Sequence, residues 1–277
     1  MQNLYSIQTA DKLFLTGGSH PVLLTCNDMN SYVCKYNIGH GAAVRLMCEY
    51  IGATFLKLWG LNVPDFASVS VKREHIPSEY HINGYYFDTT CFGLQYSRSF
   101  AEVIDFTANI SYQQRKAFPN RKDLLYLALF DIWLANEDRN QNNYNLLIDI
   151  ENQRNFIPID HEAIFNMRNM KIPICELTYE DSVISSPLFM NLFSNNDFNK
   201  SALKEIQDNF YIKVKHCNEN TVELIEQLPP DWNINKLELE TKLKNEIFDD
   251  NWLITSFNLF LEFLQRNINT KEHAIAL

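Results

Sequence analysis

The sequence lacks the features that mark a membrane-spanning, secreted or nucleic-acid-binding chain. The apolar segment Leu124 to Leu134 is too short to cross a bilayer and is interrupted by Asp131. The first residues contain no basic segment followed by an apolar run, so no signal peptide is expected. Positive charge is also scarce. The 24 Lys and Arg against 34 Asp and Glu leave a net charge of −10, which argues against direct binding to nucleic acid or to an anionic membrane.

Cysteine pairs and repeats are absent as well. The six cysteines are scattered without a Cys-x-x-Cys pair, which favours small core residues in a reducing, cytoplasmic setting over a disulfide framework or a zinc site. No internal repeat or low-complexity linker interrupts the 277 residues. What is present is a hydrophobic content of 46% and an aromatic content of 13%, enough for a sizeable core in one large domain or two lobes.

A polar segment after an apolar helix carries the strongest functional signal. Asp138 and Asn143 lie five positions apart in this segment, and a second acid, Asp160, follows 17 residues after Asn143. Between them, residues 144–150 and 155–159 read as two strands joined by a polar turn, which is typical of a hairpin. Folding this hairpin brings Asn143 and Asp160 to its open end, with Asp138 one short loop away.

This set of side chains fits phosphoryl transfer from a nucleotide. One carboxylate orients the attacking hydroxyl and accepts its proton, while an amide oxygen and a second carboxylate hold Mg²⁺ on the phosphates. Protein kinases have the same Asp-to-Asn spacing, with a metal-binding Asp after a short hairpin. The alternative is a polar surface turn, which the spacing of Asp138 and Asn143 alone does not exclude. His161 follows Asp160, but the second His of a helical zinc-protease motif is missing, so zinc is set aside.

A hairpin near the N-terminus has a glycine-rich tip. Residues 13–26 are apolar on both sides of Gly17, Gly18 and Ser19. Glycines adopt positive φ readily and can expose backbone N–H groups to phosphate oxygens. An ordinary hairpin turn is the alternative, and the tip alone does not decide between the two.

A lysine-bearing strand and a glutamate-bearing helix follow in the order found in kinases. Residues 31–37 alternate as a strand that contains Lys35, and residues 42–59 have apolar residues at helical spacing. Glu49 lies in this helix, 14 residues after Lys35. In kinases a strand Lys contacts the phosphates and is positioned by a Glu from the following helix. A solvated lysine and a solvated glutamate are the alternatives.

The remaining segments predict a two-lobed α+β protein. A strand is expected over residues 84–92 and a crossover between lobes over residues 92–96, while residues 121–136 are apolar nearly all round and predict a buried helix. Further helices are expected over residues 203–214, 221–228, 237–248 and 251–267. We predict a protein-kinase-like fold with a small, β-rich lobe at residues 1–95, which carries one main helix, and a larger, mostly helical lobe at residues 96–277.

Taken in order, these motifs resemble the HipA-like serine/threonine kinases of bacteria, in a compact form. Besides the glycine turn, Lys35 and Glu49, the resemblance rests on five runs of sequence. They are Gly60-Leu-Asn-Val-Pro64, Phe92-Gly93, Trp133-Leu-Ala-Asn-Glu-Asp-Arg139, Asn143-Tyr-Asn-Leu-Leu147 and Ile159-Asp-His161. More distantly, the Asp-Arg loop followed by Ile-Asp is similar to the phosphatidylinositol kinases and the secretory-pathway kinases.

The resemblance implies ATP and Mg²⁺ as cofactors and a Ser or Thr hydroxyl of a protein, this chain included, as the phosphate acceptor. It implies that Lys35 contacts the phosphates and that Glu49 holds Lys35. It further implies that Asp138 is the catalytic base and that Asn143 and Asp160 are metal ligands.

Some parts of the resemblance stay open. Asn145 is an alternative to Asn143 as the metal ligand, because the Asn-x-Asn pair leaves the register open by two residues. Larger HipA toxins have Asp-x-His in the catalytic loop, whereas this chain has Asp138-Arg-Asn140. The chain is also shorter than those toxins, which leaves open a toxin role and an antitoxin-like partner.

Other function classes remain to be weighed. A small-molecule or lipid hydroxyl could accept the phosphate, although the net charge of −10 disfavours lipid. A pseudokinase that acts through partners is a second class, and the intact set of Lys35, Asp138, Asn143 and Asp160 argues against it. A metal-dependent hydrolase that uses Asp138, Asp160 and His161 is a third class, and it would not need Lys35 and Glu49.

Overall fold

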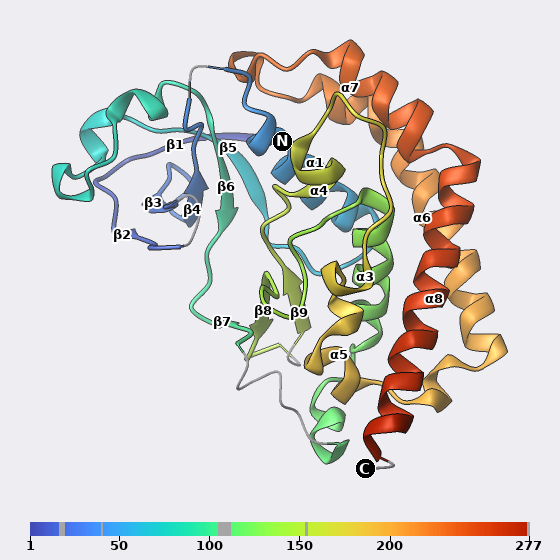
Figure 1. The fold of residues 1–277 in the computed structure, drawn as a ribbon. Helices are drawn as coiled ribbons and strands as arrows, with labels where there is room; N and C mark the ends of the chain where they lie inside the picture. Colours follow the sequence, from blue (N-terminus) through green and yellow to red (C-terminus); the bar gives the residue numbers. More distant parts are fainter. Residues whose placement is uncertain (17–19, 40, 105–111, 153–154, 276–277) are drawn as a thin grey trace.

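The chain folds into a β-sheet lobe and a helical lobe, as the computed structural model in Figure 1 shows. The structure describes residues 1–16, 20–39, 41–104, 112–152 and 155–275. The predicted α+β class with two lobes is therefore confirmed. The predicted boundary after residue 95 coincides with the end of a strand, but the division into residues 1–95 and 96–277 stays a prediction.

Six strands form the sheet of the first lobe, in the spatial order β1-β5-β6-β4-β3-β2. They are β1 (Gln2–Tyr5), β2 (Lys12–Leu13), β3 (Val22–Thr25), β4 (Ser31–Lys35), β5 (Phe66–Ser70) and β6 (Cys91–Gln95). β1 and β5 are parallel, and the other neighbours are antiparallel. Alternation along β4 puts Tyr32 and Cys34 into a small core with Val22 and Leu24 of β3. Lys35 therefore lies on the other face, toward the next helix.

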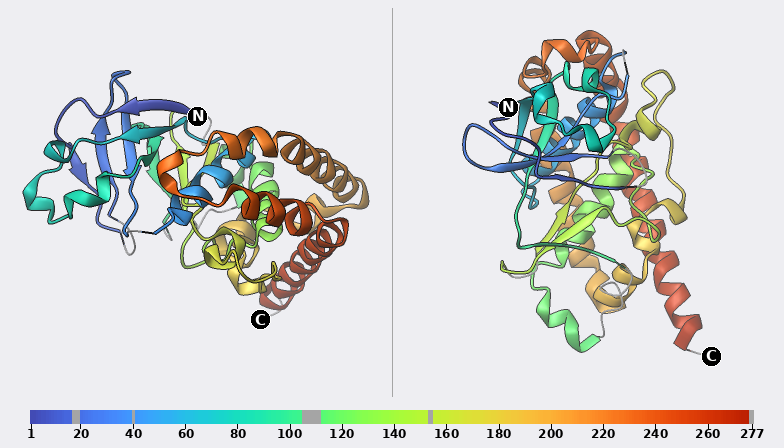
Figure 2. Two further views of the ribbon diagram at one scale, coloured as in Figure 1. Left: turned by 90° about the horizontal axis from the view of Figure 1, so that it is seen from above. Right: turned by 90° about the vertical axis from the view of Figure 1, so that its left-hand side faces the viewer.

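Helix α1 (Val44–Leu58) lies between the two lobes. Seen from above in Figure 2, it separates the six-stranded sheet from the long helices. Most of its residues are buried, and its core residues pack in one cluster with those of the helical lobe. The helix ends before Gly60, whose φ of 74° is the left-handed conformation that commonly terminates helices. Burial on nearly all sides makes α1 a rigid support for Glu49.

The helical lobe is built around helix α3. Its helices are α3 (Lys122–Leu134), α4 (Ile164–Arg168), α5 (Pro187–Leu192), α6 (Lys200–Glu226), α7 (Lys236–Lys242) and α8 (Asp250–Ile275), with a π-helical turn at Leu243–Ile247. The Trp133 indole donates a hydrogen bond to the carbonyl of Ile247 at 2.7 Å, and Trp252 donates to the carbonyl of Trp133 at 2.8 Å. α3 is thus fixed at the end from which the polar loop departs. Among the described residues, no helix is both long and apolar enough to cross a bilayer.

A three-stranded antiparallel sheet lies beside α3 in Figure 1. It consists of β7 (Phe100–Glu102), β8 (Leu146–Asp149) and β9 (Asn155–Pro158). The predicted hairpin is therefore present, and its register pairs Leu146 with Pro158. This pairing places the residues before β8 next to those after β9.

Three predicted elements differ from the structure. The strand predicted over residues 84–92 is wrong, because Gly84–Phe87 forms a 3₁₀ turn. The crossover predicted over residues 92–96 is wrong too, because β6 is a central strand through Gln95. The two helices predicted over residues 203–228 are the single helix α6. Most of residues 215–220 are polar and face solvent, while Cys217 continues the row of buried residues along the helix.

Candidate active site

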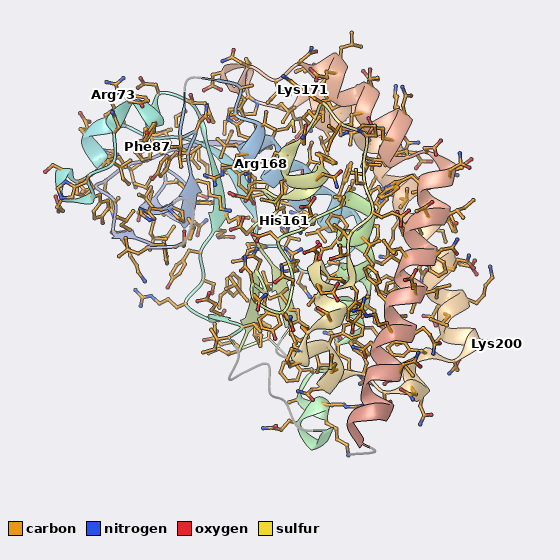
Figure 3. All side chains as sticks on the ribbon, in the orientation of Figure 1. Arg73, Phe87, His161, Arg168, Lys171 and Lys200 are labelled. Carbon is orange, nitrogen blue, oxygen red and sulfur yellow. The ribbon has the colours of Figure 1, made fainter. Side chains whose placement is uncertain are left out.

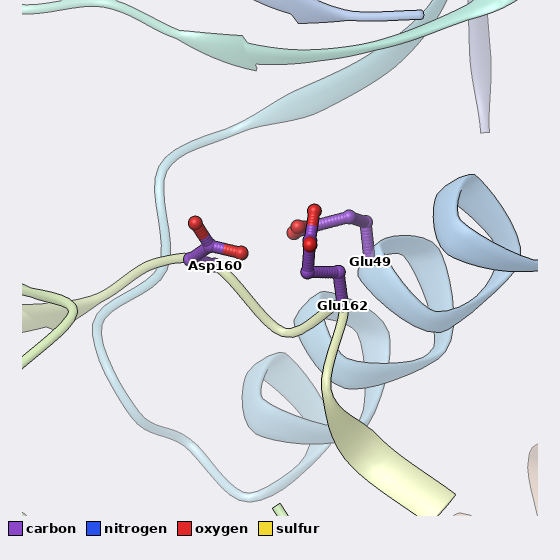
Figure 4. Close-up of side chains that lie close together, drawn as sticks. All are labelled: Glu49, Asp160 and Glu162. Carbon is purple, nitrogen blue, oxygen red and sulfur yellow. The ribbon is translucent and has the colours of Figure 1, made fainter. Parts of the chain in front are cut away.

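Lys35, Glu49 and Asp160 meet where the two lobes join. Lys35 ends β4, Glu49 lies in α1 and Asp160 follows β9. The Lys35 ammonium forms an ion pair with Glu49 Oε1 and another with Asp160 Oδ1 at 2.9 Å. Figure 4 shows the carboxylates of Glu49 and Asp160, together with that of Glu162, directed toward one point. The predicted pair of Lys35 and Glu49 is therefore formed.

Burial and the attraction between opposite charges act against each other in this cluster, and burial prevails at Glu49, whose pKa it raises to about 7 although Lys35 lowers it. Glu49, Asp160 and Glu162 each place one carboxylate oxygen within 4.8 Å of the other two, and the Lys35 ammonium pairs with Glu49 and Asp160. Burial alone would lower the pKa of Lys35, but the three carboxylates raise it. Burial would likewise raise the pKa of Asp160, but Lys35 lowers it to about 2. Lys35 is therefore cationic and Asp160 anionic at neutral pH.

Asp138 lies in the polar loop after α3, and its nearest described amide partner is Asn145. The Asn145 Nδ2 donates to Asp138 Oδ2 at 3.1 Å and to the Asp138 carbonyl at 3.2 Å. Asn143 is exposed, and its backbone pairs with that of Asn140. The structure therefore brings Asn145 to Asp138 and leaves Asn143 at the surface of the loop.

The hairpin register connects this loop to Asp160. The Ile159 N–H donates to the Asn145 carbonyl at 3.0 Å, so Asp160 leaves the hairpin beside Asn145. Both residues have left-handed backbone conformations, with φ of 45° for Asn145 and 58° for Asp160. Asn and Asp tolerate this region better than most residues. Such unusual conformations cluster at sites where the surrounding structure holds them in place.

Arg139, directly after Asp138, is completely buried. Its guanidinium forms an ion pair with Asp131 of α3 and donates to the Ile159 carbonyl at 2.8 Å. It also lies 3.3 Å from Nδ1 of His161. Arg139 thus contacts both neighbours of Asp160 in the sequence and ties them to α3.

His161 completes the link between the lobes. Burial, together with the charges of Arg139 and Lys35, holds its pKa well below the usual value, so the ring is neutral. Its backbone N–H donates to Glu49 Oε2 at 3.1 Å. α1 can approach this segment because residue 52 is glycine, and an added Cβ would lie 2.4 Å from the His161 Cβ. Figure 3 shows His161 near the middle of the molecule, between the sheet and the helices.

Sequence reasoning placed some of these residues and missed others. It selected Lys35, Glu49, Asp138, Asn143 and Asp160, of which Asn143 is exposed, while Gly17, Gly18 and Ser19 lie outside the described residues. It missed the structural roles of the residues that hold the site together: Arg139, His161, Gly52 and Glu162. The sequence offered one signal, because Arg139 directly follows Asp138 and His161 directly follows Asp160. The burial of these side chains and their contacts cannot be predicted from spacing alone.

A two-lobed fold with a Lys–Glu pair beside an acid–amide loop defines the class of kinase-like proteins. A family model described as HipA-like kinase matches residues 11–253, and the chain therefore belongs to the HipA-like kinase family. The predicted family is confirmed. A search of the curated proteins finds no match.

Several solved structures are similar to this chain at low sequence identity. The Helicobacter pylori proinflammatory kinase CtkA is 13% identical, with a TM-score of 0.54 over 94% of this chain and 98% of that chain. The Golgi casein kinase with Mn and ADP bound is 12% identical, with a TM-score of 0.44 over 95% and 75%. HipA of Shewanella oneidensis MR-1, in a complex with HipB and operator DNA, is 12% identical, with a TM-score of 0.42 over 93% and 64%.

Proposed function

We propose that this kinase uses ATP with Mg²⁺ and transfers the terminal phosphate to a Ser or Thr hydroxyl of a protein, this chain included. One observation carries the proposal. The Lys35 ammonium is held by Glu49 and lies 2.9 Å from Asp160, at the junction of the two lobes. A cation that is fixed in this way suits phosphate oxygens, which develop charge during transfer.

The side chains divide into three roles in this proposal. Lys35 contacts the phosphates and Glu49 holds Lys35. Asp138, half-buried beside an amide, orients the acceptor hydroxyl and takes its proton. Asp160 and an asparagine supply the hard oxygen ligands that Mg²⁺ prefers, and the ion when bound would neutralise phosphate charge.

The asparagine ligand is either Asn143 or Asn145. The contacts favour Asn145, because its amide nitrogen is bound to Asp138 and its amide oxygen is then free to face a metal. Asn143 remains the alternative that the spacing of five residues predicts.

Four further features belong to the proposal. The glycine turn of Gly17, Gly18 and Ser19 would contact the phosphates through its backbone. The family favours a protein substrate and suggests an antitoxin-like partner, which the short chain leaves open, and the cysteine pattern favours a cytoplasmic location. A pseudokinase, or a kinase of small-molecule or lipid hydroxyls, is the alternative function.

The decisive experiment is incubation with Mg²⁺ and ATP labelled on the terminal phosphate, with and without a mixture of candidate proteins, followed by mass analysis. Label on Ser or Thr is the expected result. Free phosphate alone would identify a hydrolase. Label on a small molecule or lipid would move the acceptor to another class, and no turnover with any acceptor would favour a pseudokinase.

Variants then assign the residues. Lys35→Ala, Asp138→Ala and Asp160→Ala should each lower turnover at least ~100-fold, because each removes a group that acts on the transferred phosphate or the hydroxyl. Asn145→Ala should do the same if Asn145 is the ligand, whereas Asn143→Ala should then change turnover little. Asp208→Ala, in an exposed ion pair on α6, is the matched control. Full activity of Asp160→Ala would refute the metal assignment.

A further inference from the structure

The carboxylate of Glu162 is held by two arginines at the edge of the site. Its Oε1 accepts from Arg45 Nη2 at 2.7 Å and from Arg168 Nη1 at 3.0 Å, while its Oε2 lies 3.9 Å from Lys35 Nζ. The Glu162 side chain is 14% exposed. Figure 4 shows this carboxylate beside that of Glu49. A third carboxylate thus stands close to Lys35 without making full contact with it.

The two arginines come from different elements. Arg45 lies on α1, one turn before Glu49 and on the same face of the helix. Arg168 ends α4, in which all residues from 165 to 168 have left-handed φ between 51° and 67°. This turn is tied to the base of the polar loop, because the Asn166 N–H donates to the Ala135 carbonyl at 3.2 Å. Figure 3 shows Arg168 above His161, near the centre of the molecule.

The position of Glu162 matters because Lys35 already contacts two carboxylates. An incoming phosphate must compete with every carboxylate for the same ammonium, and the competition grows as a carboxylate moves from 3.9 Å into contact. The two guanidinium groups offer Glu162 charge-assisted hydrogen bonds on its other oxygen. Removing either arginine would weaken that hold and let Glu162 approach Lys35.

We propose that Arg45 and Arg168 are positioning residues that hold Glu162 away from Lys35 and so keep the ammonium open to nucleotide phosphates. The inference rests on the proposed ATP site. It assigns no contact with the nucleotide to either arginine. The Glu162 carboxylate also couples α1 to the segment after Asp160, because Glu162 lies in this segment and is bonded to Arg45 of α1.

A charge-rescue experiment tests this inference by calorimetric titration with Mg·ADP. Arg168→Gln and Arg45→Gln should each weaken binding about tenfold. Adding Glu162→Gln to either variant should restore most of the affinity, because the competing charge is then gone. Arg73→Gln, in an exposed ion pair with Asp88, is the matched control and should bind as the unmodified chain does. Single variants that bind normally, or double variants as weak as the singles, would overturn the inference.

A second measurement separates this inference from the proposed function. A crystal structure of Arg168→Gln without nucleotide should show the Glu162 carboxylate in hydrogen-bond contact with Lys35. A carboxylate that stays on Arg45 at its present distance would overturn the inference whatever the binding data show. If the unmodified chain itself failed to bind Mg·ADP while Glu162 moved as expected, the proposed function would fall and the electrostatic role would stand.

Discussion

At the scale of single residues, the site depends on a close approach that only glycine permits. Gly52 of α1 faces His161, whose backbone holds Glu49 and whose ring contacts Arg139. The atom that an added methyl group would meet is the His161 Cβ, which cannot swing aside as the end of a long side chain can. A larger residue at position 52 must therefore displace α1 or the segment that carries Asp160.

We predict that Gly52→Ala lowers the free energy of unfolding by about 1–2 kcal/mol, although alanine is the better helix former. It should also weaken binding of Mg·ADP, because Glu49 moves with α1. Chemical denaturation and calorimetry measure the two effects. Gly41→Ala is the control, since nothing lies within 4 Å of an added Cβ there. If the two variants had the same stability and the same affinity for Mg·ADP, an added methyl group would fit between α1 and His161.

The same scale shows what sequence can and cannot predict. Lys35 and Glu49 were predictable because strand alternation and helical periodicity fix their faces locally. Asn143 and Asn145 were not separable, because a register shift of two residues preserves the alternation of the hairpin. Gly52 could not be identified, because its role depends on contact with a segment distant in the sequence.

At the scale of elements, the unusual feature is the left-handed turn of α4. Its four consecutive residues with positive φ, 165–168, include no glycine. Each such residue costs about 1–2 kcal/mol relative to right-handed backbone. The turn persists because Phe165 is fully buried and Asn166 is bonded to Ala135 and to Cys175. No periodicity in the sequence announces this conformation, since it is imposed by tertiary contacts.

We predict that Met167→Gly is more stable than Met167→Ala by about 1 kcal/mol, because glycine adopts positive φ without steric cost. Both variants remove the same half-exposed side chain, so their difference isolates the backbone term. At Lys171, where φ is not positive, Lys171→Gly should be less stable than Lys171→Ala. Thermal unfolding of the glycine and alanine variants at both positions gives the sign of the stability difference between glycine and alanine at each. If alanine were the more stable residue at position 167 as well as at position 171, the turn would not be left-handed.

The elements differ in how far sequence determines them. α1 was predicted because its apolar residues recur at helical spacing, and α3 because its residues are apolar nearly all round. The break predicted within α6 was wrong because a polar stretch was taken for a loop, although Cys217 keeps the buried row continuous. The crossover was misplaced because β6 is central and apolar, and such a strand has no alternation to mark its end.

At the scale of the whole molecule, the site joins the two lobes. Lys35 comes from the sheet lobe, Asp138 and Asp160 from the helical lobe, and Glu49 from the helix between them. A ligand that binds these groups together therefore stabilises both lobes at once. The order of these segments along the chain made the two-lobed fold predictable, whereas the contacts that hold the lobes together were not.

We predict that Mg·ADP raises the melting temperature of the chain in a single cooperative transition. At a concentration of about 100 times Kd the added stability is about 2.7 kcal/mol, which corresponds to roughly 5 °C for a chain of this size. Lys35→Ala and Asp160→Ala should abolish the shift, because they remove the phosphate and metal contacts, whereas Asp208→Ala should keep it. Scanning calorimetry distinguishes the outcomes. If the chain instead unfolded in two transitions and Mg·ADP raised the temperature of one of them, the lobes would unfold independently and the nucleotide would contact a single lobe.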